Sequence, residues 1–137
     1  MREILFRGKK TGTNEWVNGS LISVCGGSYI EEQVLLSKSY EVDNESVCQY
    51  IGLKDKNGTK IFEGDILKIA IIKDSEDEIE YKFGSVEFST RSLEYIIRSK
   101  EGLVCSFGVI LNGAGFYEFE LEVIGNIYDN KELLKQN

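Results

Sequence analysis

Residues 47–69 read VCQYIGLKDKNGTKIFEGDILKI, and they carry the strongest local structure signals in the chain. Asn57-Gly58 lies between segments that can pair as strands, which is typical of a β-hairpin. Glu63-Gly64-Asp65 marks a second turn, and an apolar run beginning at Ile66 follows it directly. Two turns between short apolar segments predict a small β-barrel. They do not indicate what such a barrel does.

The first turn has two interpretations. One is a two-residue type I′ turn at Asn57-Gly58. The other is a type I turn that begins at Asp55, with Gly58 in the left-handed conformation and a G1 bulge. Asp55 at the first position favours the second interpretation. Both require Gly58 to adopt a positive φ, which glycine does at little cost.

The second turn also has two interpretations. Glu63 and Asp65 flank Gly64 and could act as paired carboxylates in acid–base chemistry. The sequence fixes no basic partner and no phosphate-binding loop beside them. The simpler interpretation is structural: the three residues make the turn that precedes the Ile66 strand, and Asp65 bonds the backbone of that turn. We adopt the structural interpretation.

Several segments of the chain carry a family resemblance, in the same order as the family's own pattern. They are Ile4–Lys9 with Trp16–Gly19, then Ser46–Tyr50, then Gly52–Gly58 with Ile61–Ile66, and finally Leu121–Tyr128. Together they resemble the YopX family of bacteriophage and prophage proteins. The signature positions are Gly52, Leu53, Asp55, Asn57, Gly58, Glu63, Gly64 and Asp65. Ile51 stands where the family pattern has Thr, and residues 70–120 match only loosely.

The resemblance implies a phage origin and a C-terminal SH3-like barrel, and it implies no biochemical activity. The residues agree with a mainly β fold, because many short strands are separated by glycine turns. We therefore predict a small N-terminal β unit over residues 1–46 and an SH3-like β-barrel over residues 47–137. A short C-terminal helix is expected over Asp129–Gln136, with Asp129 as its N-cap. Val34-Leu35-Leu36, in the N-terminal unit, is ambiguous between a strand end and a short helix.

The charge of the chain bears on nucleic-acid binding. The formal net charge is −7, and residues 69–137 hold 7 Lys and Arg against 13 Asp and Glu. Such a balance repels a phosphate backbone on average. The one basic cluster is N-terminal and comprises Arg2, Arg7, Lys9 and Lys10. Nucleic acid is thus an unfavoured partner, and contact through this cluster is the alternative function.

The chain offers little for catalysis or metal binding. It has no histidine, so it lacks the commonest general base and the commonest metal ligand. Its three cysteines, Cys25, Cys48 and Cys105, show neither a disulfide framework nor a zinc spacing. The acidic residues 74–80 lack the glycine and the ligand spacing of a calcium loop. We predict no enzyme activity and no catalytic, cofactor or metal site.

The function that these observations favour is a non-enzymatic protein-interaction module of a phage or prophage. A partner protein or self-association is expected, and alternating strands with open edges predict a homo-oligomer. No apolar run approaches the roughly 20 residues that a membrane helix needs, and no signal-peptide pattern is present. We therefore expect the protein to act in the cytoplasm of the bacterial host.

Overall fold

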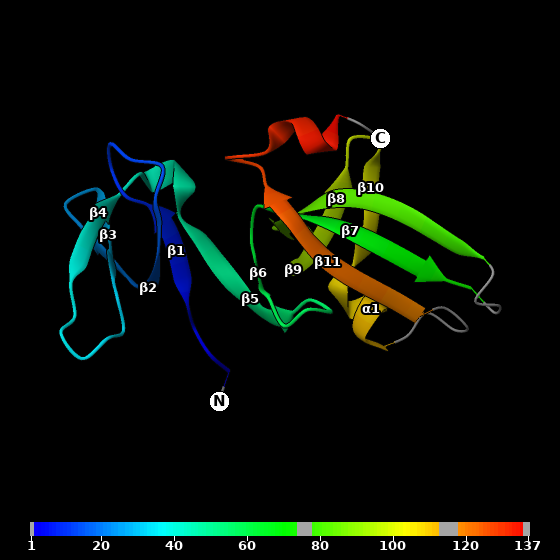
Figure 1. The fold of residues 1–137 in the computed structure, drawn as a ribbon, viewed down its shortest axis with the longest axis horizontal. Helices are drawn as coiled ribbons and strands as arrows, with labels where there is room; N and C mark the ends of the chain where they lie inside the picture. The colour runs from blue at the N-terminus through cyan, green and yellow to red at the C-terminus, as the bar shows by residue number, and fades with distance from the viewer. Residues whose placement is uncertain (1, 74–77, 113–117, 136–137) are drawn as a thin grey trace. The chain divides into compact units, whose positions relative to one another are not determined.

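The computed structural model describes residues 2–73, 78–112 and 118–135 of the 137-residue chain (Figure 1). Antiparallel strands in two sheets make up most of these residues. The chain divides into two compact units, Met1–Gly52 and Leu53–Asn137. The predicted mainly β fold is confirmed. No closed barrel occurs in the described residues, so the SH3-like barrel stays a prediction.

Unit 1 is built from strands that are adjacent in the sequence. Its elements are β1 (Phe6–Lys9), β2 (Trp16–Val24), β3 (Gly27–Glu31), β4 (Ser39–Val42), the 3₁₀ turn η1 (Asn44–Ser46) and the first part of β5 (Cys48–Lys54). Their order is β4-β3-β2-β1-β5, and β6 (Lys60–Phe62) follows β5 in the same sheet. β1 and β2 form an antiparallel hairpin near the N-terminus, with Lys9 opposite Trp16.

The long strand β2 serves two neighbours and so curls unit 1 around a small core. Its first half pairs with β1 and its second half pairs with β3. The buried centre is made by Val17, Ile30 and Val42. The far edge of β4 is tied back to the end of β1, because the Asp43 N–H donates to the Lys9 carbonyl at 2.9 Å. This tie covers an edge that would otherwise be open.

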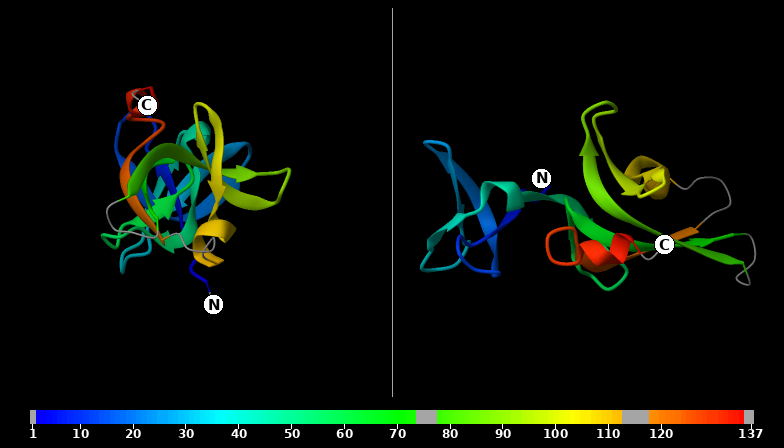
Figure 2. Two further views of the ribbon diagram at one scale, coloured as in Figure 1. Left: turned by 90° about the vertical axis from the view of Figure 1, so that its right-hand side faces the viewer. Right: turned by 90° about the horizontal axis from the view of Figure 1, so that it is seen from above.

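Unit 2 is a five-stranded antiparallel sheet with two short helical segments. Its remaining elements are β7 (Asp65–Ile72), β8 (Ile79–Ser89), β9 (Glu94–Ser99), β10 (Gly102–Ser106), α1 (Phe107–Asn112), β11 (Glu118–Asn126) and the 3₁₀ turn η2 (Lys131–Leu134). The strand order is β10-β9-β8-β7-β11, and α1 packs beside β9 and β10 (Figure 2). Ile66, Leu67 and Ile69 of β7 are fully buried. β7 is an interior strand with neighbours on both sides, which explains why the run after Ile66 is almost continuously apolar.

The C-terminal helix differs from the prediction. The structure has a single 3₁₀ turn, η2, whose N-cap residue is Asn130 and which has no side-chain cap. Asp129 is therefore not the cap that we predicted. The Asn126 side chain explains the difference: its Oδ1 accepts the N–H groups of Tyr128 at 3.0 Å and Asp129 at 2.9 Å. Because these bonds form a tight turn after β11, the helical segment begins later.

Leu93 combines two unfavourable features. Its φ is 57°, in the left-handed region that branched and bulky residues avoid, and its side chain is 76% exposed. The backbone is held there by a hydrogen bond from the Leu93 N–H to the Ser89 carbonyl at 2.8 Å. The β8–β9 turn therefore contains local backbone strain that no side-chain burial offsets.

We predict that Leu93→Asn stabilises the protein. Asparagine tolerates the left-handed conformation better than leucine, and little apolar burial is lost, so the free energy of unfolding should rise by about 0.5–1 kcal/mol. Urea unfolding of purified variants measures this. The control is Ile4→Asn, because Ile4 is also exposed and its φ is not positive. A Leu93→Asn protein no more stable than the wild type would contradict the prediction.

Candidate functional site

The turn at Asp55 is the second of the two predicted alternatives. The Gly58 N–H donates to the Asp55 carbonyl at 3.0 Å, and the Asp55 N–H donates to the Thr59 carbonyl at 2.8 Å. Gly58 has a φ of 82°. Cys25 and Leu93 are the positive-φ residues other than glycine in the described chain, which rules out a type I′ turn because Asn57 would need a positive φ. The turn begins at Asp55.

The carboxylate of Asp55 accepts three backbone hydrogen bonds. Its Oδ1 accepts the N–H groups of Asn57 and Thr59, each at 2.9 Å. Its Oδ2 accepts the N–H of Val123 in β11 at 2.9 Å, from a residue 68 positions away in the sequence. The Lys56 N–H adds a bond to the Leu121 carbonyl at 2.9 Å. The hairpin turn is thereby fastened to the last strand of unit 2.

These contacts set the acidity of Asp55. Burial by itself raises the pKa of the carboxyl group, because it disfavours the charged form. The N–H groups of Val123, Thr59 and Asn57 and the positive charge of Lys56 outweigh burial, and the pKa of Asp55 lies below its usual value. The ionised form is therefore part of the folded structure.

The second signature turn is also a structural junction. Asp65 is 1% exposed, and its Oδ2 accepts the Phe62 N–H at 2.8 Å, so the predicted bond to the turn backbone is present. Gly64 has a φ of 82°, donates its N–H to the Val86 carbonyl at 2.8 Å and accepts the Ile127 N–H at 2.8 Å. The turn thus joins the start of β7 to β8 and to the residue that follows β11.

The other signature positions differ in backbone conformation and in exposure. Gly52 has a φ of 92° within β5. Asn57 and Gly58 are exposed at the tip of the turn, while Leu53 and Glu63 are half-buried. The Asp55 and Asp65 carboxylates each bond the backbone of their own turn. The geometry of these bonds accounts for both residues without assigning them a chemical reaction.

The N-terminal basic residues lie against aromatic rings in unit 1. The Arg7 guanidinium is 4.7 Å from the centroid of the Trp16 ring, and the Lys9 ammonium is 5.5 Å from the same centroid. Lys10 lies 4.0 Å from the centroid of the Tyr40 ring and forms an ion pair with Glu15 at 3.4 Å. Arg2 is exposed and precedes β1. Three of the four cations are therefore engaged within the unit.

The loop between β3 and β4 carries a feature that the sequence analysis did not find. The predicted alternatives for Val34-Leu35-Leu36 were a strand end or a short helix, but the segment is an irregular loop. The exposed fractions are 57% for Val34, 102% for Leu35 and 83% for Leu36. A hydrogen bond from the Glu32 N–H to the Lys38 carbonyl at 3.0 Å closes the base of the loop. One feature of the sequence could have indicated this loop: the apolar run is too short for a helix and has polar residues on both sides.

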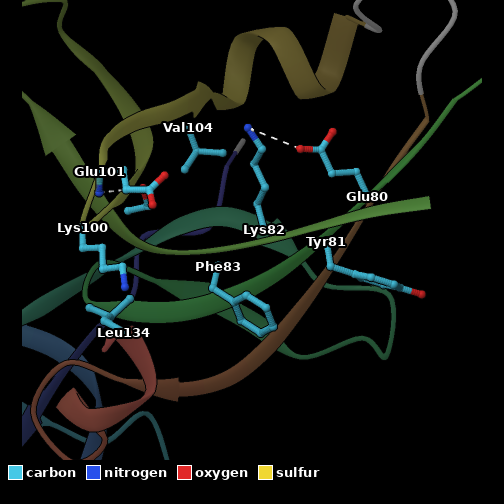
Figure 3. Close-up of a pocket in the computed structure, with 9 residues that line it drawn as sticks. Glu80, Tyr81, Lys82, Phe83, Lys100, Glu101, Val104 and Leu134 are labelled. Atoms are coloured by element: carbon cyan, nitrogen blue, oxygen red, sulfur yellow. Dashed lines mark hydrogen bonds and ion pairs between the residues drawn. The ribbon is translucent and has the colours of Figure 1, made fainter. Parts of the chain in front are cut away.

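Unit 2 contains an open cavity of about 400 Å³ between β8, the β9–β10 turn and η2 (Figure 3). Figure 3 shows Val104 and Lys82 on one side of it and Phe83, Lys100 and Leu134 on the other. Lys82 forms an ion pair with Glu80 at 3.8 Å. No ion pair engages Lys100 or Glu101 within the described part of the chain. The residues come from three separated segments, which is why the sequence alone did not reveal the cavity.

The cysteines lie in different environments. Cys25 is exposed in the β2–β3 turn, and Cys48 is buried, with its thiol donating to the Ser46 carbonyl at 3.2 Å. Cys105 is half-buried, and burial raises the pKa of its thiol despite the opposing charge of Lys82. In the described residues, no three acidic or cysteine side chains gather around a common point as metal ligands would. Nor does any described helix have the length and apolar character needed to cross a membrane.

Comparison with known proteins gives one match. The model of a family described as "YopX protein" matches residues 5–135, which is nearly the whole chain. No curated protein and no solved structure matches.

We predict that Gly58→Val lowers the free energy of unfolding by about 1–3 kcal/mol, because a β-branched residue is strained at positive φ. A side chain at this position would meet no atom within 4 Å, so strain rather than a clash is the cause. Gly58→Asn is the matched variant, and it should lose less because asparagine tolerates this conformation. Equal losses in urea unfolding would argue against backbone strain.

We predict that Asp55→Asn lowers the free energy of unfolding by about 1.5–3 kcal/mol near neutral pH, because an amide nitrogen replaces one accepting oxygen. The folded pKa lies below the unfolded value, so the carboxylate stabilises the fold above about pH 4. That contribution is lost as the pH falls through the folded pKa, and the difference between variant and wild type should shrink accordingly.

Urea unfolding over a pH series measures this difference. Asp43→Asn is the control, because it makes the same charge change at an exposed carboxylate that forms no side-chain cap of η1. It should leave stability nearly unchanged at every pH. A deficit of Asp55→Asn that stays constant down to acid pH would contradict the role given to the ionised form.

Proposed function

The chain belongs to the YopX family, and from this premise we propose that it is a non-enzymatic phage or prophage module that binds a protein partner. The partner-binding element in this proposal is the exposed loop Val34-Leu35-Leu36. We further propose that the protein acts in the cytoplasm of the bacterial host.

The exposure of three adjacent apolar residues carries the proposal. Single exposed apolar side chains are common on protein surfaces, but contiguous ones mark interaction sites. Leu35 and Leu36 are each largely exposed, and the charged residues Glu32 and Lys38 lie on either side of them in the sequence. Burying one such side chain contributes roughly 1.5–3 kcal/mol. Two leucines therefore contribute a substantial part of the free energy of a contact.

The contacts of the basic cluster support a protein partner over nucleic acid. Arg7, Lys9 and Lys10 lie over the rings of Trp16 and Tyr40, so those ring faces are occupied by the protein's own cations. Base stacking needs such faces to be open. The net charge of −7 adds a long-range repulsion toward phosphate.

We propose that unit 2 corresponds to the SH3-like barrel of the family resemblance and serves as the scaffold. Two ties support this: the Asp55 turn is bonded to β11, and Gly64 is bonded to both Val86 and Ile127. Such ties bring the β5–β6 and β6–β7 connections against the sheet, as a small barrel requires.

The test is affinity capture from the phage-infected or prophage-induced host with tagged full-length chain. We expect proteins captured by the wild type to be lost with Leu35→Ser/Leu36→Ser and kept with Val24→Ser, which changes another exposed apolar residue of unit 1. Calorimetry with the purified captured protein should show at least about tenfold weaker binding by the loop variant, or about 1.4 kcal/mol.

Two results would contradict the proposal. One is capture that is unchanged when both leucines are replaced. The other is capture that disappears after nuclease treatment, which would favour the alternative that the N-terminal cluster Arg2, Arg7, Lys9 and Lys10 binds nucleic acid.

A further inference from the structure

The β3–β4 loop has the form of an apolar plug with one charge of each sign at its base. Val34, Leu35 and Leu36 form the apolar tip. Glu32 and Lys38 stand side by side at the base, because the backbone bond of 3.0 Å joins them. In the described chain no ion pair engages either charge. The plug therefore presents both a buriable surface and two charges available to a partner.

The cavity of unit 2 also combines apolar residues with one free charge of each sign in the described chain (Figure 3). Phe83, Val104 and Leu134 give it apolar groups, and the adjacent Lys100 and Glu101 give it one charge of each sign. Glu80 and Lys82 also line it and pair with each other. Its volume of about 400 Å³ is within the range of pockets that enclose a ligand, about 300–1,000 Å³, and suits a few aliphatic side chains. Binding interfaces commonly combine apolar groups with charged ones, as this cavity does.

We propose that the loop of one copy inserts into this cavity of a second copy. Leu35 and Leu36 would contact the apolar groups, Glu32 would face Lys100, and Lys38 would face Glu101. This inference rests on the proposed function, since it names a second copy of the chain as a partner of the same loop. Charge complementarity selects this partner: the apolar centre and both charges of the plug each have a counterpart at the cavity.

The symmetry of such a contact determines which oligomers it produces. Plug and cavity are different surfaces, so the contact is heterologous and generates rings or chains rather than a self-complementary pair. A single loop buries less surface than a standard interface, and association is therefore weak and visible at high protein concentration. Added salt should weaken association by screening the attraction between the exposed charges of the loop and the cavity.

The experiment uses analytical ultracentrifugation of the full chain at high concentration with two complementary variants. Leu35→Ser/Leu36→Ser removes the plug, and Lys100→Glu/Leu134→Ser removes the cavity. Each variant alone should self-associate at least tenfold more weakly than the wild type. Melting curves verify that each variant is folded. A one-to-one mixture should form a dimer and nothing larger, because each variant supplies the half that the other lacks. Val24→Ser is the control and should associate like the wild type.

A charge exchange gives an independent readout. Glu32→Lys and Lys100→Glu should each weaken association, and the chain carrying both should recover it. A monomeric wild type at all concentrations, an inactive mixture or a charge exchange without recovery would overturn the inference. Those outcomes leave the proposed function intact if loop-dependent capture of another protein persists. If the loop variant captures the same proteins as the wild type and also self-associates as strongly, both the inference and the proposed function are overturned.

Discussion

The Asp55 carboxylate is the contact on which the arrangement of unit 2 depends. It stabilises its own turn through Asn57 and Thr59, and through Val123 it fastens that turn to β11. A turn residue that bonds only its neighbours shapes a hairpin, whereas one that also bonds a distant strand sets where the hairpin lies. A charged acceptor strengthens each of these bonds relative to a neutral one. The ionised state of a single residue thus links local and long-range structure.

The Glu63–Asp65 turn extends the same constraint by different means. Here the tie is made by backbone groups of Gly64, which bond Val86 on one side and Ile127 on the other. Asp65 keeps that backbone in place through its bond to Phe62. Because β7 begins at Asp65, its buried apolar residues enter the sheet in a register that the turn has already set. Two short turns therefore position β7, an interior strand of the unit 2 sheet.

The sequence predicted the local part of this arrangement and missed the long-range part. Asp55 and Gly58 were sufficient to favour the correct turn type, because both requirements are local. The partner of the Asp55 Oδ2 lies 68 residues away, and nothing in the spacing of residues identifies Val123. The predicted C-terminal helix was longer than η2, because the Asn126 side chain forms a competing turn that helix-capping patterns do not anticipate.

The candidate sites also differ in how far the sequence alone could predict them. Apolar runs are interpreted as buried by default, so the exposure of Leu35 was outside the reach of periodicity. Glu63 and Asp65 flank the second turn as possible paired carboxylates, and the Asp65 Oδ2 accepts the Phe62 N–H of that turn. Loss of that acceptor would leave the Phe62 N–H without the bond that holds the turn. The side chains of Leu35 and Leu36 are exposed and hold no part of the fold together, which is why we propose them, and not the signature acids, as the surface that a partner contacts.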